Sequence, residues 1–89
     1  MKAVITVVGK DTVGILAKVA GKCAQYNVNV IEVSQTVLQE MFCMIMICDI
    51  SAISVEFIRF SEAMEELGRE MGMRIHTMHE DIFESMHHI

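Results

Sequence analysis

The sequence predicts an α+β fold of the ferredoxin-like type, in which an antiparallel four-stranded sheet carries two helices on one face. The expected elements follow the order β-α-β-β-α-β, and a short helix follows at the C-terminus. Residues 2–9 and 41–48, the first and third expected strands, are apolar on both alternating faces. Such strands belong in the middle of a sheet, and in this fold the first and third strands are the central ones. The order of the elements and the pattern of apolar residues therefore point independently to the same architecture.

Length and composition predict a single domain, residues 1–89, that associates with a second subunit. A chain of 89 residues buries only about 60–65% of its unfolded surface, so it is marginally stable by itself. Its apolar fraction is nevertheless 53%, and nine of the apolar residues are methionine. We therefore expect a partner subunit to cover part of the apolar surface.

The charge of the chain argues against a nucleic-acid partner and against binding to an anionic membrane. Both of those surfaces select clustered Lys and Arg. This chain has a net charge of −5 and only seven basic residues, which are scattered along the sequence. The longest apolar stretch, residues 41–48, is far too short to cross a bilayer, and no signal peptide is evident.

The three cysteines are an odd number and form no Cys-x-x-Cys motif. Proteins from an oxidising compartment usually carry an even, regularly spaced set. We therefore expect Cys23, Cys43 and Cys48 to be small buried apolar residues in a reducing environment. The expected location is cytoplasmic.

The first half of the chain predicts a strand, a helix and a strand that ends in a tight reversal. Asp11 is a good N-cap for a helix over about residues 12–26, and Asn27 can take the left-handed conformation that ends it. Residues 29–38 alternate between apolar and polar, as expected of an edge strand, and Gln39-Glu40 forms the reversal. The helical spacing predicts a buried stripe made of Ile15, Leu16, Val19, Ala20 and Cys23.

The second half repeats the pattern with a longer helix. Residues 49–54 form a polar connection in which Ser51 or Ser54 is available as the cap of a helix over about residues 55–71. Its buried stripe is Phe57, Phe60, Met64, Leu67 and Met71, and Gly68 beside it lets the helix approach the sheet closely. Gly72 ends the helix, residues 73–78 form the fourth strand, and Asp81 caps the short tail helix.

The sheet face opposite the helices is expected to be an association surface. Both helices lie on one face, since each crossover is right-handed. The other face then exposes alternate residues of two apolar strands, and an exposed patch of that kind normally marks a contact site. We therefore expect a homodimer formed by packing of sheet faces or of edges.

The loop Gly9–Gly14 is the best candidate for a functional site. A junction between a strand and a helix presents free backbone N–H groups and the positive end of a helix dipole, so it can hold a small anion or a carboxylate. A glycine at position 14 makes sense where backbone must approach a ligand or a partner closely. The alternative is that Gly14 packs against the sheet and Asp11 is only a cap.

Asn29 is the second candidate, because it opens the second strand directly after the helix exit. Its amide can donate to a carboxylate and accept from an amine at the same time, which suits an amino acid. The alternative is an asparagine that serves only the turn.

No metal, cofactor or catalytic site is expected. Along a strand His76 and His79 do not share a face, and His87 and His88 are adjacent rather than four residues apart, so a solvated cluster is the better interpretation. No Ser/His/Asp or Cys/His arrangement can be placed, and the glutamates of the second helix form a solvated face. The sequence therefore predicts a protein that is not an enzyme.

The residues of the loop and the second strand resemble those of the ACT domain family. In that family a strand leads into G-x-D-x-x-G-[IL], here Gly9–Ile15, and N-[IV] opens the second strand, here Asn29-Val30. Residues 31–37, residues 42–44 and the closing stretch 79–83 are similar to a group of small bacterial proteins that consist of one ACT domain. The resemblance covers nearly the whole chain.

The resemblance implies a regulatory module that dimerises and binds an amino acid at the subunit interface. This sequence departs from many ACT proteins in that it has no attached catalytic domain. By position, Asp11 and Gly14 would shape the loop, Asn29 would hydrogen-bond the ligand, and Val30 would contribute backbone groups. The regulated target would be a separate protein. The alternative is an interaction module in which the loop and the sheet serve dimerisation or docking and no ligand binds.

Overall fold

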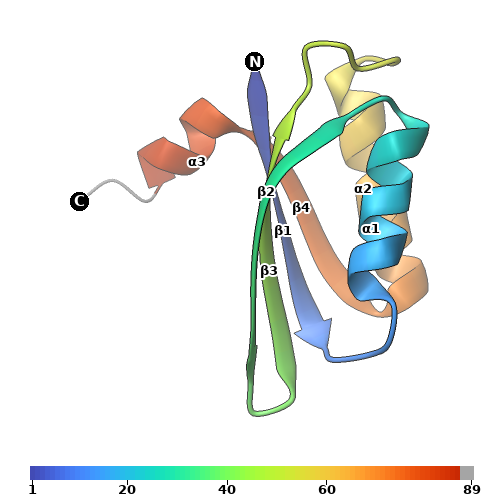
Figure 1. Cartoon of the computed structure of the whole chain (residues 1–89), viewed down its shortest axis with the longest axis vertical. Helices are drawn as coiled ribbons and strands as arrows, with labels where there is room; N and C mark the ends of the chain where they lie inside the picture. The colour runs from blue at the N-terminus through green and yellow to red at the C-terminus, as the bar shows by residue number, and fades with distance from the viewer. Residues whose placement is uncertain (87–89) are drawn as a thin grey trace.

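A computed structural model describes residues 1–86 and has the predicted order of elements (Figure 1). Helices α1 and α2 cover one face of the sheet, and α3 lies on the other side. The elements are β1 (Lys2–Lys10), α1 (Ile15–Gln25), β2 (Asn29–Leu38), β3 (Met41–Asp49), α2 (Phe57–Met71), β4 (Met73–His79) and α3 (Glu80–Met86).

The sheet has the strand order β2-β3-β1-β4, and all neighbouring strands are antiparallel. The two doubly apolar strands are thus central, which confirms the prediction. Strand β1 pairs with β3 without interruption, from Lys2 opposite Asp49 to Lys10 opposite Met41. The pairing of β2 with β3 shifts register between Val30 and Glu32, so β2 carries a bulge near its start.

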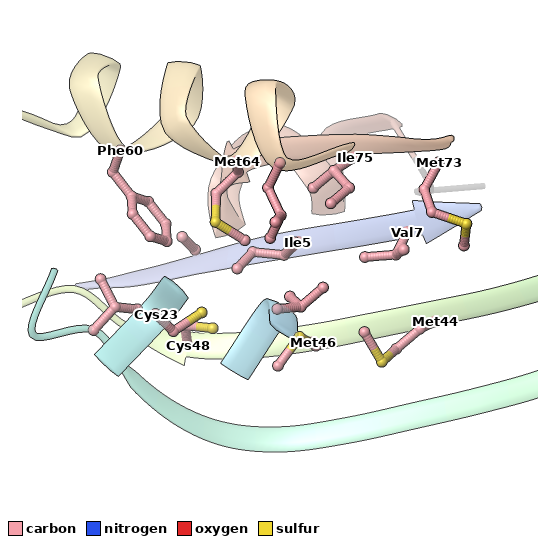
Figure 2. Close-up of a cluster of buried hydrophobic side chains, with 14 of the residues drawn as sticks. Ile5, Val7, Cys23, Met44, Met46, Cys48, Phe60, Met64, Met73 and Ile75 are labelled. Carbon is pink, nitrogen blue, oxygen red and sulfur yellow. The ribbon is translucent and has the colours of Figure 1, made fainter. Parts of the chain in front are cut away.

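The core lies between the sheet and the two helices, and sulfur-containing side chains make up much of it (Figure 2). Ile5 and Val7 of β1 lie at its centre, and Phe60 of α2 is completely buried. The other fully buried large side chains of this core are Val19, Cys23, Met44, Met46, Cys48 and Met64. Methionine is flexible and fills irregular gaps between a sheet and helices, which accounts for its frequency here.

Two glycines of α2 have the roles that the sequence predicts. A side-chain carbon at Gly68 would lie 2.8 Å from the carbonyl oxygen of Met73, so glycine is required where α2 approaches β4. Gly72 is the C-cap of α2 with a φ of 68°, a left-handed conformation that favours glycine. The Gln39-Glu40 reversal is also confirmed, with φ values of 51° and 71° that fit a tight hairpin turn.

The first helix begins later than predicted, and Asp11 is not its cap. Gly14 occupies the N-cap position and α1 starts at Ile15, because the preceding residues form a turn. Leu16 was expected in the buried stripe but is 40% exposed, whereas Ile15, Val19 and Cys23 are buried.

The other two predicted caps are also wrong. Helix α2 has Glu56 at its N-cap with no side-chain hydrogen bond to the backbone, so neither Ser51 nor Ser54 caps it. Helix α3 starts at Glu80, which places Asp81 in its first turn. Asn27 does take the left-handed conformation after α1, with a φ of 59°.

The sheet face opposite the core is only partly covered. Val4 points to this face and is nevertheless buried, because α3 packs over this end of the sheet. Further along the same face, Val8 and Ile45 are exposed by about two fifths of their surface. Cys43 also lies here and is half-exposed, unlike the buried Cys23 and Cys48. No helix within residues 1–86 is long and apolar enough to cross a membrane.

Candidate functional site

The loop between β1 and α1 ends in a glycine that is required by its backbone conformation. Gly14 has a φ of 85° and a ψ of 12°, in the left-handed region where other residues are strained. A side-chain carbon added at this position would meet no atom within 4 Å. The interpretation that Gly14 packs against the sheet is therefore wrong, and the space beside it is open.

The N-terminus of α1 presents backbone donors without a competing side chain. Within residues 1–86 no side chain caps this helix, and its first turn contains no acidic residue. The first N–H groups of a helix have no intrahelical partner, and the helix dipole places a partial positive charge beside them. This end of α1 can therefore bind a carboxylate or another small anion.

Asp11 fixes the loop to the neighbouring hairpin. Its backbone N–H donates a hydrogen bond of 3.0 Å to the carbonyl oxygen of Glu40, in the β2–β3 turn. Its side chain is exposed. The loop and the tip of the hairpin thus form one structural unit at this end of the molecule (Figure 1).

Asn29 and Val30 lie at the start of β2, where the strand enters the sheet. Asn29 is exposed and stands opposite Asp49 in the register, whereas Val30 is half-buried and packs against the core. Among the described residues, the Asn29 side chain makes no hydrogen bond, so both ends of its amide are free to bind a ligand.

Asn29 lines a cavity of about 300 Å³ that the sequence did not predict. The volume matches the lower end of the range for small-molecule sites. Its lining combines the end of α1, the start of β2 and the end of β3, and includes Ala24, Asn27, Asn29, Asp49, Ser51 and Ala52. The only signal in the sequence was the charged Asp49 at the end of an otherwise apolar strand.

Asp49 is the charged residue of this cavity. Hydrogen bonds from the hydroxyl and the backbone N–H of Ser51 lower the pKa of the Asp49 carboxyl, the second of them 2.9 Å long. The N-terminal ammonium group, which donates a hydrogen bond of 3.1 Å to the Ser51 hydroxyl, also lowers this pKa, and so does Lys2, which pairs with Asp49 in the sheet. The carboxylate is therefore ionised and held in a defined orientation at neutral pH.

One protomer does not bring the predicted site residues together. Asp11 and Gly14 precede α1, and Asn29 and Val30 follow it (Figure 1). Helix α1 has 11 residues, which corresponds to a length of about 16 Å. An amino acid is too short to bridge that distance, so the two pairs can only act on one ligand if they come from different copies of the chain.

The structure describes His76 and His79 of the four histidines. No group of three or more metal-binding side chains occurs within residues 1–86. His76 is exposed, and His79 stacks on the ring of Phe57 with a centroid separation of 4.2 Å, a contact that the sequence did not indicate. His87 and His88 lie outside the described residues.

Apolar side chains are also exposed along the edge strand β2. All of its residues except Val30 are exposed, and none of the strands described within residues 1–86 pairs with its outer edge. An unpaired edge is a template for pairing with another chain. The exposed apolar residues of this strand are Ile31, Val33, Val37 and Leu38.

Comparison with known proteins places the whole chain in one family. A family model described as the ACT domain matches residues 2–78. A UPF0237 protein of Listeria innocua is 46% identical over 87 residues, and the alignment covers 98% of each chain. A UPF0237 protein of the archaeon Methanococcus maripaludis is 46% identical over 86 residues, covering 97% of this chain and 96% of the relative.

A solved structure of an ACT domain protein from Streptococcus pneumoniae has the same fold. It is 40% identical to this chain, the alignment covers 94% of both chains, and the TM-score is 0.82. The relatives extend from bacteria to archaea, which is wider than the bacterial group that the sequence resembles. From the family model, the relatives and the shared architecture, the chain belongs to the ACT domain family.

Proposed function

We propose that this protein is a small regulatory protein that binds an amino acid between two copies of the chain and signals to a separate partner. ACT domains are generally regulatory domains that bind amino acids. The amino acid's carboxylate binds at the loop around Asp11 and Gly14 of one copy. Its other end contacts Asn29 and the backbone of Val30 of the second copy.

The observation that carries this proposal is the placement of complementary groups at opposite ends of α1. The helix start offers N–H donors to a carboxylate. The cavity at the other end contains an ionised carboxylate and an unpaired amide. Together these groups match the two charged ends of an amino acid, but only across an interface between copies.

The exposed edge of β2 provides a way to build such an interface. Antiparallel pairing of two β2 strands about a two-fold axis places the start of one strand beside the end of the other. The end of β2 leads into the hairpin turn to which the Asp11 loop is hydrogen-bonded. Edge pairing therefore brings the loop of one copy toward Asn29 of the second copy, at two equivalent sites.

The signal follows from thermodynamic linkage. An amino acid that contacts both copies binds one dimer arrangement more tightly than any other, so it shifts the population toward that arrangement. A partner protein that recognises this arrangement then responds to the amino acid concentration. No chemical reaction is needed, and this chain acts as a sensor rather than an enzyme.

The second candidate function is an interaction module without a ligand. It is favoured by the exposed apolar residues, since Val8 and Ile45 on the open sheet face and the edge of β2 are available for docking whether or not a metabolite binds.

Thermal unfolding with each of the twenty amino acids separates the two candidates. An amino acid present at 100 times its dissociation constant should stabilise the protein by about 2.7 kcal/mol. Stabilisation by one amino acid or a few related ones supports the sensor. If no amino acid raises the unfolding temperature and the protein is still a dimer in analytical ultracentrifugation, the interaction module is the better account.

A further inference from the structure

The cavity beside Asn29 has walls that are fixed before any ligand arrives. The side-chain amide of Asn27 donates a hydrogen bond of 2.8 Å to the carbonyl oxygen of Ala52. The backbone N–H of Ser54 donates a bond of 3.0 Å to the carbonyl oxygen of Tyr26. These two bonds tie the turn after α1 to the loop after β3. A ligand that enters the cavity therefore loses little free energy to the ordering of these two segments.

The polar groups of this cavity are mainly acceptors. The Asp49 carboxylate is ionised and oriented by Ser51. The nitrogen of the Asn27 amide is already engaged with Ala52, so the group that Asn27 still offers is its oxygen. Asn29 supplies a further amide oxygen. A set of acceptors around one negative charge favours a cationic group with several donors.

We infer that this cavity is the ammonium subsite of the amino-acid site, with the Asp49 carboxylate as the counter-ion of the ligand's α-ammonium group. This inference rests on the proposed function and adds Asp49 and Asn27 to the residues that resemblance assigns. An ammonium group has three donors, which match the Asp49 carboxylate and the oxygens of the two asparagines. Lys2 stands on the other side of Asp49 in the sheet register from Asn29. The N-terminal ammonium group is hydrogen-bonded to the Ser51 hydroxyl, and neither Met1 nor Lys2 is among the residues that line the cavity.

The inference predicts which compounds the protein accepts. A free α-amino acid binds with its ammonium group at Asp49 and its carboxylate at the start of the partner copy's helix. An N-acetyl amino acid keeps the side chain and the carboxylate but loses the charge, and a 2-hydroxy acid loses two of the three donors. Both analogues lack the ammonium charge that would face the Asp49 carboxylate, so both should bind much more weakly.

The test measures binding by isothermal titration calorimetry in the wild type, Asp49→Asn and Glu62→Gln. Asparagine keeps the oxygen that accepts from the Ser51 N–H, so the turn is preserved while the charge is lost. Glu62 is exposed on α2, and its amide variant makes the same change in net charge away from the cavity. The probes are the amino acids that stabilise the wild type, each compared with its N-acetyl and 2-hydroxy analogues.

The expected result is a dissociation constant raised about tenfold or more in Asp49→Asn and unchanged in Glu62→Gln, because the lost contact is a charge-assisted hydrogen bond. The two analogues should bind wild type and Asp49→Asn with similar, weak affinity. An amino acid that binds wild type and Asp49→Asn equally overturns the Asp49 assignment and leaves the sensor function intact. If none of the twenty amino acids binds the wild type, the sensor function and this inference both fail.

Discussion

The two glycines at the start and in the middle of α1 should respond in opposite ways to replacement by alanine. Gly14 has a φ of 85°, whereas Gly21 lies inside the helix, on its exposed side, with open space beside it. Gly14→Ala should lower the free energy of unfolding by about 1 kcal/mol, because alanine is strained in the left-handed region. Gly21→Ala should raise it by about 0.5–1 kcal/mol, because alanine favours the helix. Urea unfolding at one fixed protein concentration measures both, and equal effects would contradict this description of the loop.

The three cysteines should differ in reactivity. Cys43 is half-exposed, whereas Cys23 and Cys48 are buried. Burial keeps reagents away from both thiols. The hydrogen bond between them lowers the pKa of Cys23, and the same bond followed by burial raises the pKa of Cys48. A thiol reagent should therefore modify Cys43 in the native protein and all three only after denaturation, and Cys43→Ser should abolish the native reaction.

The reaction of Cys43 with a thiol reagent also distinguishes a dimer formed by pairing of β2 edges from one formed by packing of sheet faces. Cys43 lies on the open sheet face, which edge pairing of β2 leaves exposed. Slow modification of Cys43 in a dimer would contradict edge pairing and favour packing of the two sheet faces.

Caps were the least predictable features at this scale. Aspartate is a common N-cap residue, so Asp11 was expected to begin the helix. The backbone angles decide where a helix begins, and here the left-handed Gly14 is the N-cap, three residues later. Leu16 fits the helical period, yet its side chain is 40% exposed because it lies at the margin of the stripe. Gly72 and Asn27 were predictable, since each requires a left-handed conformation at a helix end.

At the level of elements, the contact between α2 and β4 depends on a missing side chain. A carbon at Gly68 would lie 2.8 Å from the carbonyl oxygen of Met73, a backbone atom that cannot move without shifting the strand. Gly68→Ala should therefore lower the free energy of unfolding by about 1 kcal/mol or more, since overpacking outweighs the better helix propensity. Urea unfolding checks this, with Gly21→Ala as the matched control that should move in the other direction.

The edge of β2 should be the dimer interface. Val33 lies near the middle of the strand and is 37% exposed, so Val33→Lys places two like charges close to the two-fold axis. Analytical ultracentrifugation at micromolar concentration should show a dimer for the wild type and a monomer for this variant. Ile58→Lys makes the same exchange on the exposed side of α2 and should remain a dimer. A Val33→Lys variant that is still a dimer would show that the edge of β2 is not the dimer interface.

The order, pairing and burial of the strands were predictable because each depends on a short, regular pattern. Strands β1 and β3 are apolar on both faces and are central, and β2 alternates and lies at the edge. The bulge in β2 was not predictable, since it depends on register between two strands. The cavity at Asn29 was missed for a related reason, because its walls come from segments far apart in the sequence.

For the whole molecule, the fold separates the candidate binding groups rather than collecting them. The loop at Gly14 and the cavity at Asn29 lie at opposite ends of α1. Under the proposed function each copy contributes half of a binding site, so ligand binding and association become interdependent. An isolated protomer is then expected to bind an amino acid weakly.

A site shared between two copies couples amino-acid binding to dimerisation. An amino acid that binds the wild type should also tighten its dimer, and by linkage the monomeric Val33→Lys variant should bind that amino acid far more weakly. Sedimentation of both proteins with and without the amino acid measures the change in dimer association, and calorimetry measures the affinity of each protein for the amino acid. Equal affinity in the monomer and the dimer would show that the site lies within one copy.

Whether two copies share one ligand is tested most directly by the backbone amide shifts of ¹⁵N-labelled protein titrated with amino acids at millimolar concentration. One amino acid should move two separate groups of signals together, those around Gly14 and those around Asn29 and Asp49, with the same dissociation constant. Shifts confined to one end of α1, or no shifts with any amino acid, would contradict a site shared between two copies.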